Sequence, residues 1–453
     1  MPPASPNVLL NLFVTGSGYH EASWKVAGPG RPRTLGLDHF AHVACTAERG
    51  MLDSLFFADS PGVELFRTKF MLQSGYDPVD LLAALIPVTS HIGLLATAST
   101  TYSSPWDLAR RFATLDHLSD GRAGWNIVTT TSPVAAGNFA DRPHPPHADR
   151  YARAEEFVEA VVKVWDAWED DAVVASLDSG IWADPGKLHP PGHSGERFSV
   201  AGILPFPRSP QGHPVMAQAG SSDAGIDLAG RFADVVFTPQ ASIDAAVAFR
   251  ERMRASAERH GRSGDDIRAL PGLSFVLGST EAEAEAAWDQ LQAASSEEFR
   301  RLNLAHVAGV DQSLAAAVDP DGPFPYELFE NAAAKTFGAA VNRTAREGDL
   351  TFRHVAEQMA TLPGGLHFTG APEGLADLIE TWWRSGGADG FTLQPLRLPL
   401  DAELFVDHVV PILQRRGIAR REYAPGTLRD RLGLPRPGRY ESNPSPSLSS
   451  ARR

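Results

Sequence analysis

Residues 121–151 read GRAGWNIVTTTSPVAAGNFADRPHPPHADRY, and this stretch decides the fold of the chain. Its apolar run Ala123–Val128 has the length and composition of a buried strand. Three threonines and a long polar loop follow the run, and His147 and Tyr151 stand at the start of an amphipathic helix. A strand, a polar strand end, a wide loop and a helix in this order are typical of an α/β active site.

The same alternation of strand and helix patterns extends along the chain in both directions. We expect eight strands, at residues 9–14, 54–59, 92–99, 122–130, 214–221, 234–240, 273–278 and 390–396. Most are followed by a helical pattern, which predicts an α/β fold, a TIM (β/α)8 barrel with insertions in its loops. A doubly wound open sheet is the alternative. The first turn, GSGYHE, lacks the third glycine of a dinucleotide-binding fingerprint, which disfavours that alternative.

Three segments fit no simple strand–helix unit. They lie near residues 135–150, 170–212 and 292–359, and we interpret them as insertions in a single domain over residues 1–434. Residues 435–453 are rich in Pro, Ser and Arg, which predicts a flexible tail.

Composition excludes several classes of function. The 453 residues carry a formal net charge of −14 and no concentrated basic stripe, so a nucleic-acid partner is not expected. Cys45 is the single cysteine, which rules out an intramolecular disulfide and a thiolate metal cluster. No apolar run approaches the length of a membrane span and no signal peptide is visible, so we expect a cytoplasmic protein without a membrane partner.

The side chains at the predicted strand ends are polar but include few conventional catalytic groups. No Ser-His-Asp or Cys-His arrangement is present, so the sequence names no catalytic residue and instead predicts a bound cofactor. Residues 219–222, Ala-Gly-Ser-Ser, could bind a phosphate at a helix start, although serine is also an ordinary helix cap. A metal is not expected, because the prolines between His144 and His147 hold that pair in a rigid, non-helical run.

Six stretches in order carry a resemblance to a known family. The chain resembles bacterial-luciferase-like flavin-dependent monooxygenases, in the branch of the nitrilotriacetate, EDTA, dibenzothiophene-sulfone and long-chain alkane monooxygenases. The stretches run from about residue 9 to 434 and read LNLFVTGSGYHEASW, AERGMLDSLFFADS, TASTTYSSPWDLARRFATLDHLSDGRAGWNIVTT, NFADRPHPPHADRYARAEEFVEAVVKVWDAW, VMAQAGSSDAGIDLAGRFADVVFT and VVPILQRRGIARREYAPGTLRDRLGL.

The resemblance implies the cofactor chemistry and the partners. It implies a two-component enzyme that uses FMN as FMNH2 and activates O2 as a C4a-(hydro)peroxyflavin to oxygenate a small organic substrate. A separate NAD(P)H:flavin reductase would supply the FMNH2, and the protein would be a homodimer or homotetramer. An F420-dependent hydride-transfer oxidoreductase and a non-catalytic flavin-binding protein are the alternatives.

The resemblance also assigns roles to residues of this chain. Asp59 would face the isoalloxazine, with Thr101 and Asn126 along the flavin edge. The ribityl-phosphate end would be held by His147, Tyr151, Ser221 and Ser222. Pro146 stands where relatives often carry an acidic residue before the histidine.

We also expect residues that bind the substrate and segments that cover the mouth of the barrel. Segments 135–148 and 292–359 would cover the mouth, the second as a mobile lid. The predicted substrate-binding residues are Tyr19, His20, Phe56, Tyr102 and Trp106.

Overall fold

The computed structural model of the chain describes residues 7–26, 35–72, 75–139, 143–332, 335–359 and 365–439. Eight parallel strands form a closed barrel, because β1 pairs with both β2 and β13 and β11 pairs with both β10 and β13. In barrel order the strands are β1 (Leu9–Phe13), β2 (Ser54–Phe57), β3 (Gly93–Ser99), β4 (Ala123–Val128), β9 (Val215–Ala219), β10 (Val235–Thr238), β11 (Arg268–Leu277) and β13 (Gly390–Pro395). The predicted TIM barrel is confirmed, and the open-sheet alternative is wrong.

One predicted strand starts in the wrong place. β11 begins at Arg268 rather than at residue 273, and it includes Pro271. A charged residue and a proline argue against a central strand from sequence alone. In the fold, however, the Arg268 guanidinium donates to the backbone carbonyls of Leu432 and Gly433 near the C-terminus, which satisfies the buried charge. A further strand that was not predicted, β12 (Leu366–Gly370), pairs parallel with the second half of β11.

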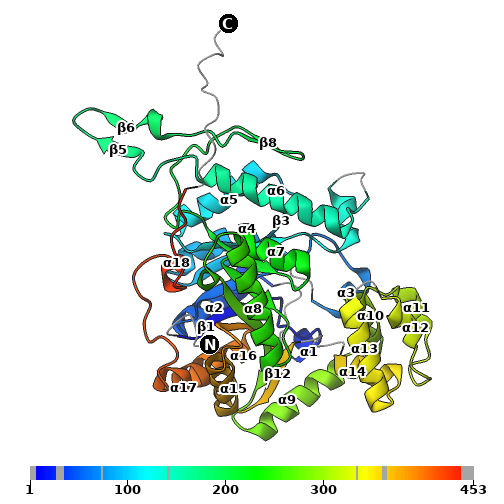
Figure 1. The fold of residues 1–453 in the computed structure, drawn as a ribbon. Helices are drawn as coiled ribbons and strands as arrows, with labels where there is room; N and C mark the ends of the chain where they lie inside the picture. Colours follow the sequence, from blue (N-terminus) through cyan, green and yellow to red (C-terminus); the bar gives the residue numbers. More distant parts are fainter. Residues whose placement is uncertain are drawn as a thin grey trace.

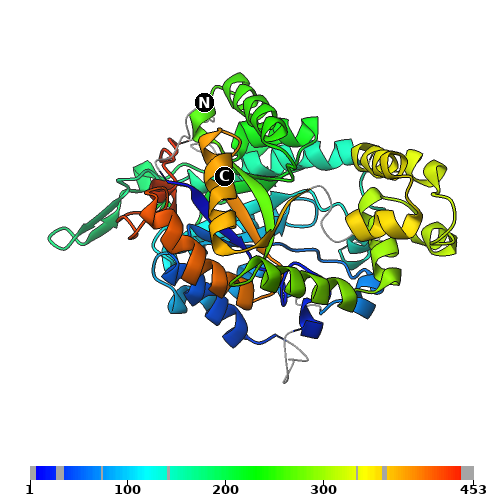
Figure 2. The ribbon, with the colours of Figure 1, turned by 90° about the horizontal axis from the view of Figure 1, so that it is seen from below.

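Helices surround the strands, as Figure 2 shows. They are α2 (Leu37–Arg49), α4 (Pro78–Leu85), α5 (Pro105–Leu118), α6 (His147–Trp165), α7 (Asp223–Phe232), α8 (Ile243–Arg259), α9 (Glu281–Ala294), α15 (Pro372–Arg384), α16 (Leu400–Leu404) and α17 (Val410–Arg415). Local sequence signals determine where several of these helices begin. For example, the Asp77 carboxylate accepts the backbone N–H groups of Val79 and Asp80 at 2.8 and 3.4 Å, and Pro78 occupies the first helical position of α4.

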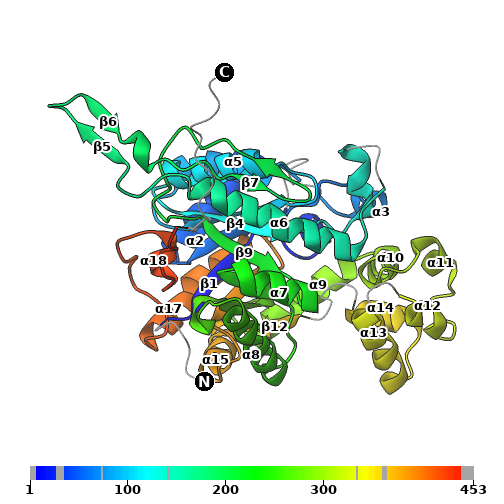
Figure 3. The ribbon, with the colours of Figure 1, turned by 45° about the horizontal axis from the view of Figure 1, so that its top comes forward.

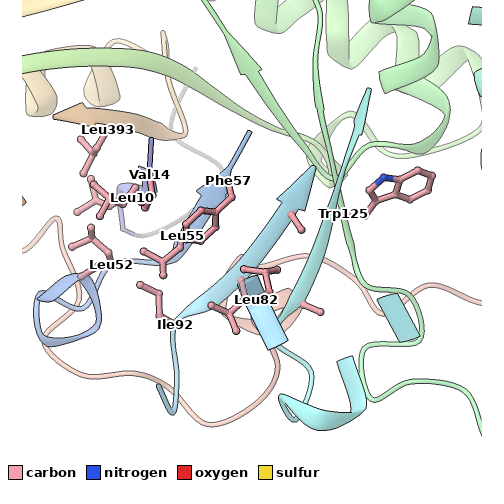
Figure 4. Close-up of a cluster of buried hydrophobic side chains, with 14 of the residues drawn as sticks. Leu10, Val14, Leu52, Leu55, Phe57, Leu82, Ile92, Trp125 and Leu393 are labelled. Atoms are coloured by element: carbon pink, nitrogen blue, oxygen red, sulfur yellow. The ribbon is translucent and has the colours of Figure 1, made fainter. Parts of the chain in front are cut away.

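Two apolar layers hold the barrel together. Leu10, Leu55, Trp125 and Leu393 belong to the layer between strands and helices, which is drawn in Figure 4. Alternate residues point into the barrel, where Leu9, Phe56 and Leu95 pack with Val215. The short helix α18 (Leu428–Arg431) adds Leu428, and Leu432 and Leu434 follow it, so the C-terminal part of the chain completes this inner layer.

The long segments between strands form separate small structures. After α6 the chain forms two hairpins, β5 (Val173–Ser176) with β6 (Ile181–Ala183) and β7 (His193–Ser194) with β8 (Ser199–Val200). The β5–β6 hairpin projects from the body of the protein (Figure 1). After α9 come α10 (Glu297–Ala308), α11 (Gln312–Ala317), α12 (Tyr326–Glu330), α13 (Lys335–Gly348) and α14 (Phe352–Met359).

These five helices, the yellow group of Figure 1, have an apolar core of their own around Leu304, Phe329 and Phe352. α10 also packs against α3 (Leu65–Phe70), a short helix in the loop after β2 (Figure 3). In the described part of the chain, no helix has both the length and the apolar character needed to cross a bilayer.

Candidate functional site

Two adjoining cavities open at the carboxyl ends of the strands. The first, here called the barrel cavity, has a volume of about 300 Å³ and is lined by Phe56, Phe237 and Gln394 among others. The second, here called the outer cavity, has a volume of about 390 Å³ and lies between the loops after β1 and β2 and helix α10. Phe13 and Tyr19 line both cavities, so the two spaces share a wall. This is the end of a TIM barrel at which active sites are built.

Aromatic rings form the apolar surface of the barrel cavity. The ring of Phe56 lies 4.4 Å from that of Phe237 and 5.2 Å from that of Phe13, measured between centroids. Tyr19 meets Phe13 edge-to-face at 5.6 Å, and burial raises the pKa of its phenol. A flat apolar ligand would find complementary surfaces here. Tyr19 and Phe56, two of the five predicted substrate contacts, therefore line the cavities.

Asp59 lines the outer cavity directly after β2. Its carboxyl group is half-buried, and burial together with the nearby charge of Asp77 raises its pKa to about 6. A carboxyl group with such a pKa changes its protonation state near neutral pH, which suits a group that exchanges a proton with a ligand.

Thr101 is buried just after β3, and Asn126 is buried within β4. The Thr101 hydroxyl donates to the backbone carbonyl of Thr129 at 2.9 Å, and the Asn126 amide donates to the Thr97 hydroxyl at 2.9 Å. The amide oxygen of Asn126 is buried without a hydrogen-bond partner among the described residues. A buried unpaired acceptor is costly, so this atom is suited to a ligand donor.

Thr130 is one of the three threonines after the predicted strand and was not among the predicted cofactor or substrate contacts, but its backbone distinguishes it. Its φ is +35°, in the left-handed region that β-branched residues rarely occupy, and its hydroxyl lies 2.6 Å from that of Ser99. Strained backbone of this kind is often found at functional sites. No sequence pattern signals it, because threonine is ordinary at a strand end.

Two hydroxyl groups meet at the N-terminus of α7. Ser222 caps this helix, and its hydroxyl accepts the backbone N–H of Gly225 at 3.2 Å. A Cβ atom placed on Gly225 would lie 3.2 Å from both the Ser222 hydroxyl and the Tyr151 hydroxyl. The ring of Tyr151 in turn lies 4.8 Å from that of His147, and Ser221 is exposed just before the helix. Hydroxyl donors at a helix N-terminus fit a phosphate group.

The other three predicted substrate contacts lie outside both cavity linings. His20 is buried, and its Nδ1 accepts the backbone N–H of Ala22 at 3.1 Å. The hydroxyl of Tyr102 lies 2.9 Å from Nδ1 of His144. The indole N–H of Trp106 donates to the Gly202 carbonyl at 2.9 Å, beside strand β8. Tyr102 and Trp106 thus have partners within the protein, whereas Nε2 of His20 is buried without a hydrogen-bond partner among the described residues.

Arg67 is the main residue of the site that sequence reasoning missed. It lies on α3 and lines the outer cavity together with Asn303 of α10. A single arginine in a loop carries no motif, and Asn303 is more than 200 positions away in the chain, so only the fold brings them together.

The family profile described as luciferase-like monooxygenase matches residues 17–389. The chain belongs to this family. It is 41% identical over 439 residues to N-acetyl-S-(2-succino)cysteine monooxygenase of Bacillus subtilis, covering 96% of this chain and 99% of that protein. It is 40% identical over 454 residues to nitrilotriacetate monooxygenase component A of Aminobacter aminovorans, covering 98% of this chain and 100% of that protein. The predicted family and branch are confirmed, and the protein is an enzyme, a flavin-dependent monooxygenase.

A solved structure supports a flavin cofactor. A riboflavin lyase, determined with modified FMN and its substrate riboflavin, matches with a TM-score of 0.81 and 33% identity, covering 94% of this chain and 96% of that one. The features of this luciferase-like protein fit such a group, because an aromatic cavity suits a flat ring system and the α7 hydroxyls suit a phosphate.

Proposed function

We propose that the protein is the oxygenase component of a two-component system that uses FMNH2 and O2 to oxygenate a small organic substrate. The observation that carries this proposal is the meeting of the Tyr151 and Ser222 hydroxyls around Gly225, at the N-terminus of a helix beside the barrel mouth. A relative with 40% identity is named component A, which supports the two-component assignment. A separate NAD(P)H:flavin reductase would then deliver the reduced flavin.

Each part of the site has a proposed task. Tyr151, Ser221, Ser222 and His147 would hold the phosphate end of the flavin, with charge-assisted hydrogen bonds from the hydroxyls. The ring system would lie in the barrel cavity against the aromatic side chains, and Asp59 would approach it from the adjoining outer cavity. Thr101 and Asn126, which are buried outside both cavity linings, are proposed to contact the flavin edge. When bound, the reduced flavin supplies the electrons that activate O2.

Protein groups would provide the proton handling and the exclusion of water. Asp59, whose pKa is about 6, is placed to exchange a proton at its carboxyl oxygens. Phe299 and Val307 of the helical insertion line the outer cavity and would keep bulk water from it. The insertion would therefore act as a cover for the substrate space, and the mobile lid expected from the sequence stays a prediction.

Relatives of nearly equal identity carry different substrates in their names, N-acetyl-S-(2-succino)cysteine and nitrilotriacetate. The proposal for this chain therefore includes oxidation at a C–N, C–S or C–H bond of a small molecule. Tyr19 and Phe56 are proposed to contact that molecule because they line the cavities.

Rapid mixing of the purified protein and anaerobic FMNH2 with air-saturated buffer tests the proposal. We expect a transient absorbance that differs from that of reduced and of oxidised FMN, and that decays more slowly than free FMNH2 oxidises. Conversion to oxidised FMN at the rate of the free flavin would contradict the proposal. A steady-state assay with an added flavin reductase should show O2 consumption that depends on both proteins.

A further inference from the structure

Arg67 is a half-buried cation, and the protein pairs only part of its guanidinium. Its Nη2 donates to the Asn303 amide oxygen at 2.8 Å, while its Nε is buried without a hydrogen-bond partner among the described residues. Within the same residues, no carboxylate oxygen lies within 4.0 Å of its guanidinium. A guanidinium carries five N–H donors, and leaving such donors buried and unpaired is costly.

The nearest acidic group does not fill this position. Glu64 acts on Arg67 electrostatically, but one of its oxygens accepts the Ser132 hydroxyl at 2.9 Å, which directs the carboxylate to the loop after β4. Arg67 is also the one lysine or arginine among the described residues that line the outer cavity. The described lining therefore offers one positive group, Arg67, among three carboxyl groups.

The surroundings select the kind of anion. The guanidinium presents parallel N–H groups in a plane, which match the two oxygens of a carboxylate. Glu21, Asp59 and Glu64 line the same cavity, so a group with two negative charges would meet more repulsion than a single carboxylate. Phe40, Phe57 and Phe299 line the rest of the space, and they suit the carbon skeleton that bears the carboxylate.

The position of Arg67 also suits the proposed chemistry. Tyr19 interacts electrostatically with Arg67, and its side chain lines both the outer cavity and the barrel cavity. A ligand held at Arg67 would therefore extend past Tyr19 towards the space in which the flavin is proposed to lie.

We propose that the outer cavity binds a carboxylate group of the substrate through the Arg67 guanidinium, which Asn303 holds in position. This inference rests on the proposed function, because a bound acid is a substrate only if the protein oxygenates it. The substrates are then small organic acids with at least one carboxylate, and Arg67 is the specificity-determining residue.

The test compares an acid with its ester. The probes are N-acetyl-S-carboxymethylcysteine and its dimethyl ester, titrated calorimetrically into the flavin-free protein at pH 8. We expect the acid to bind the wild-type protein at least tenfold more tightly than the ester. The Arg67→Gln variant should lose this preference. Equal affinities in the wild-type protein, no binding of either probe, or an unchanged preference in Arg67→Gln would each overturn the proposal.

Two further variants separate recognition from structural support. Asn303→Asp places a carboxylate beside Nη2, which should occupy the guanidinium and abolish the acid preference while preserving the link between α3 and α10. Lys69→Gln is the matched control, because Lys69 is on the same helix and its ion pair with Glu298 also joins α3 to α10 at 2.6 Å. Lys69→Gln should keep the tenfold preference. An acid preference that survives in Asn303→Asp would show that Arg67 has only a structural role.

Anaerobic FMNH2 binding, measured in the same variants, distinguishes this inference from the proposed function. We expect wild-type FMNH2 affinity in Arg67→Gln, Asn303→Asp and Lys69→Gln. If FMNH2 binds and the acid preference is absent, the carboxylate proposal fails alone. If the acid preference is present and FMNH2 does not bind, the proposed function fails and the carboxylate site stands.

Discussion

The hydroxyl groups of Tyr151 and Ser222 approach the same point from two different helices: a Cβ atom on Gly225 would lie 3.2 Å from each. Tyr151 belongs to the first turns of α6, and Ser222 is the cap of α7. The glycine leaves room for both hydroxyls, because the Cβ atom of any other residue would be in tight contact with each of them. The arrangement provides two donors and a helix N-terminus for one anion.

Removal of either hydroxyl should weaken flavin binding. Tyr151→Phe and Ser222→Ala are each expected to cost about 1–2 kcal/mol in FMNH2 affinity, because each removes a hydrogen bond to a charged group. Anaerobic fluorescence titration measures the effect. Ser242→Ala is the matched control, since Ser242 caps α8 in the same way, through a 3.3 Å bond from the N–H of Ala245. Wild-type affinity in both Tyr151→Phe and Ser222→Ala would refute the placement of the phosphate.

The raised pKa of Asp59 should appear in the pH dependence of stability. Its folded-state pKa of about 6 lies above the ordinary 3.8, so the native state holds the proton more tightly than the unfolded state. As the pH rises from about 3.8 to about 6, the unfolded state ionises first, and stability falls over this window. Asp59→Asn should remove this loss and raise the melting temperature at pH 7.5 by on the order of 1 °C. Melting curves recorded between pH 4 and 8 measure this effect. If the melting temperatures of Asp59→Asn and the wild type differ by the same amount at every pH in that range, the prediction is wrong.

Helix α10 forms one wall of the outer cavity. We expect this wall to determine how much of the consumed O2 ends in oxygenated product and how much is released as H2O2. Val307 is half-buried and lines this cavity, so Val307→Ser should admit water and raise the ratio of H2O2 to oxygenated product, by about two- to fivefold. Leu314→Ser is the control, because Leu314 is on the same insertion with 55% of its surface exposed. Peroxide yield per NADH consumed gives the measurement. An equal yield in both variants would mean that the insertion does not protect the site.

A buried ion pair near the C-terminus should carry much of the barrel's stability. Arg429 binds both carboxylate oxygens of Asp234, at 2.9 and 2.7 Å, and its side chain is buried. Arg429→Met would leave Asp234 buried without this partner, at a cost of about 3–5 kcal/mol in the free energy of unfolding. Urea denaturation measures the loss. Arg415→Met, at an exposed position, should leave the unfolding midpoint unchanged.

The same pair gives a second, pH-dependent expectation. Burial opposes ionisation of Asp234, but the charge and hydrogen bonds of Arg429 outweigh it and the pKa of Asp234 is lowered. The stabilisation by this pair should therefore be present above about pH 4 and be lost as the pH falls below it. Combining Arg429→Met with Asp234→Asn should recover part of the loss at pH 7. No recovery in the double variant would show that packing, rather than the unpaired charge, causes the destabilisation.

The sequence by itself determined the barrel and the order of its parts. Apolar runs such as Ala123–Val128 predict buried strands, because a strand that is covered on both faces carries apolar side chains on both faces. Signals such as Asp77–Pro78 place helix starts, because capping depends on neighbouring residues alone. The start of β11 was misplaced because Arg268 is satisfied by the carbonyls of Leu432 and Gly433, which lie far away in the chain. β12 was missed because its partner, the second half of β11, is also distant in the sequence.

Only the tertiary structure decided which residues share a cavity. Tyr19 and His20 are adjacent in sequence, yet Tyr19 lines both cavities and His20 is buried outside their linings. Tyr151 and Ser222, and likewise Arg67 and Asn303, meet because the closed barrel brings distant loops to one rim. Hydrophobic periodicity is a local property of the chain, whereas the convergence of polar groups depends on how every element packs, and for that reason the fold could be predicted before the site.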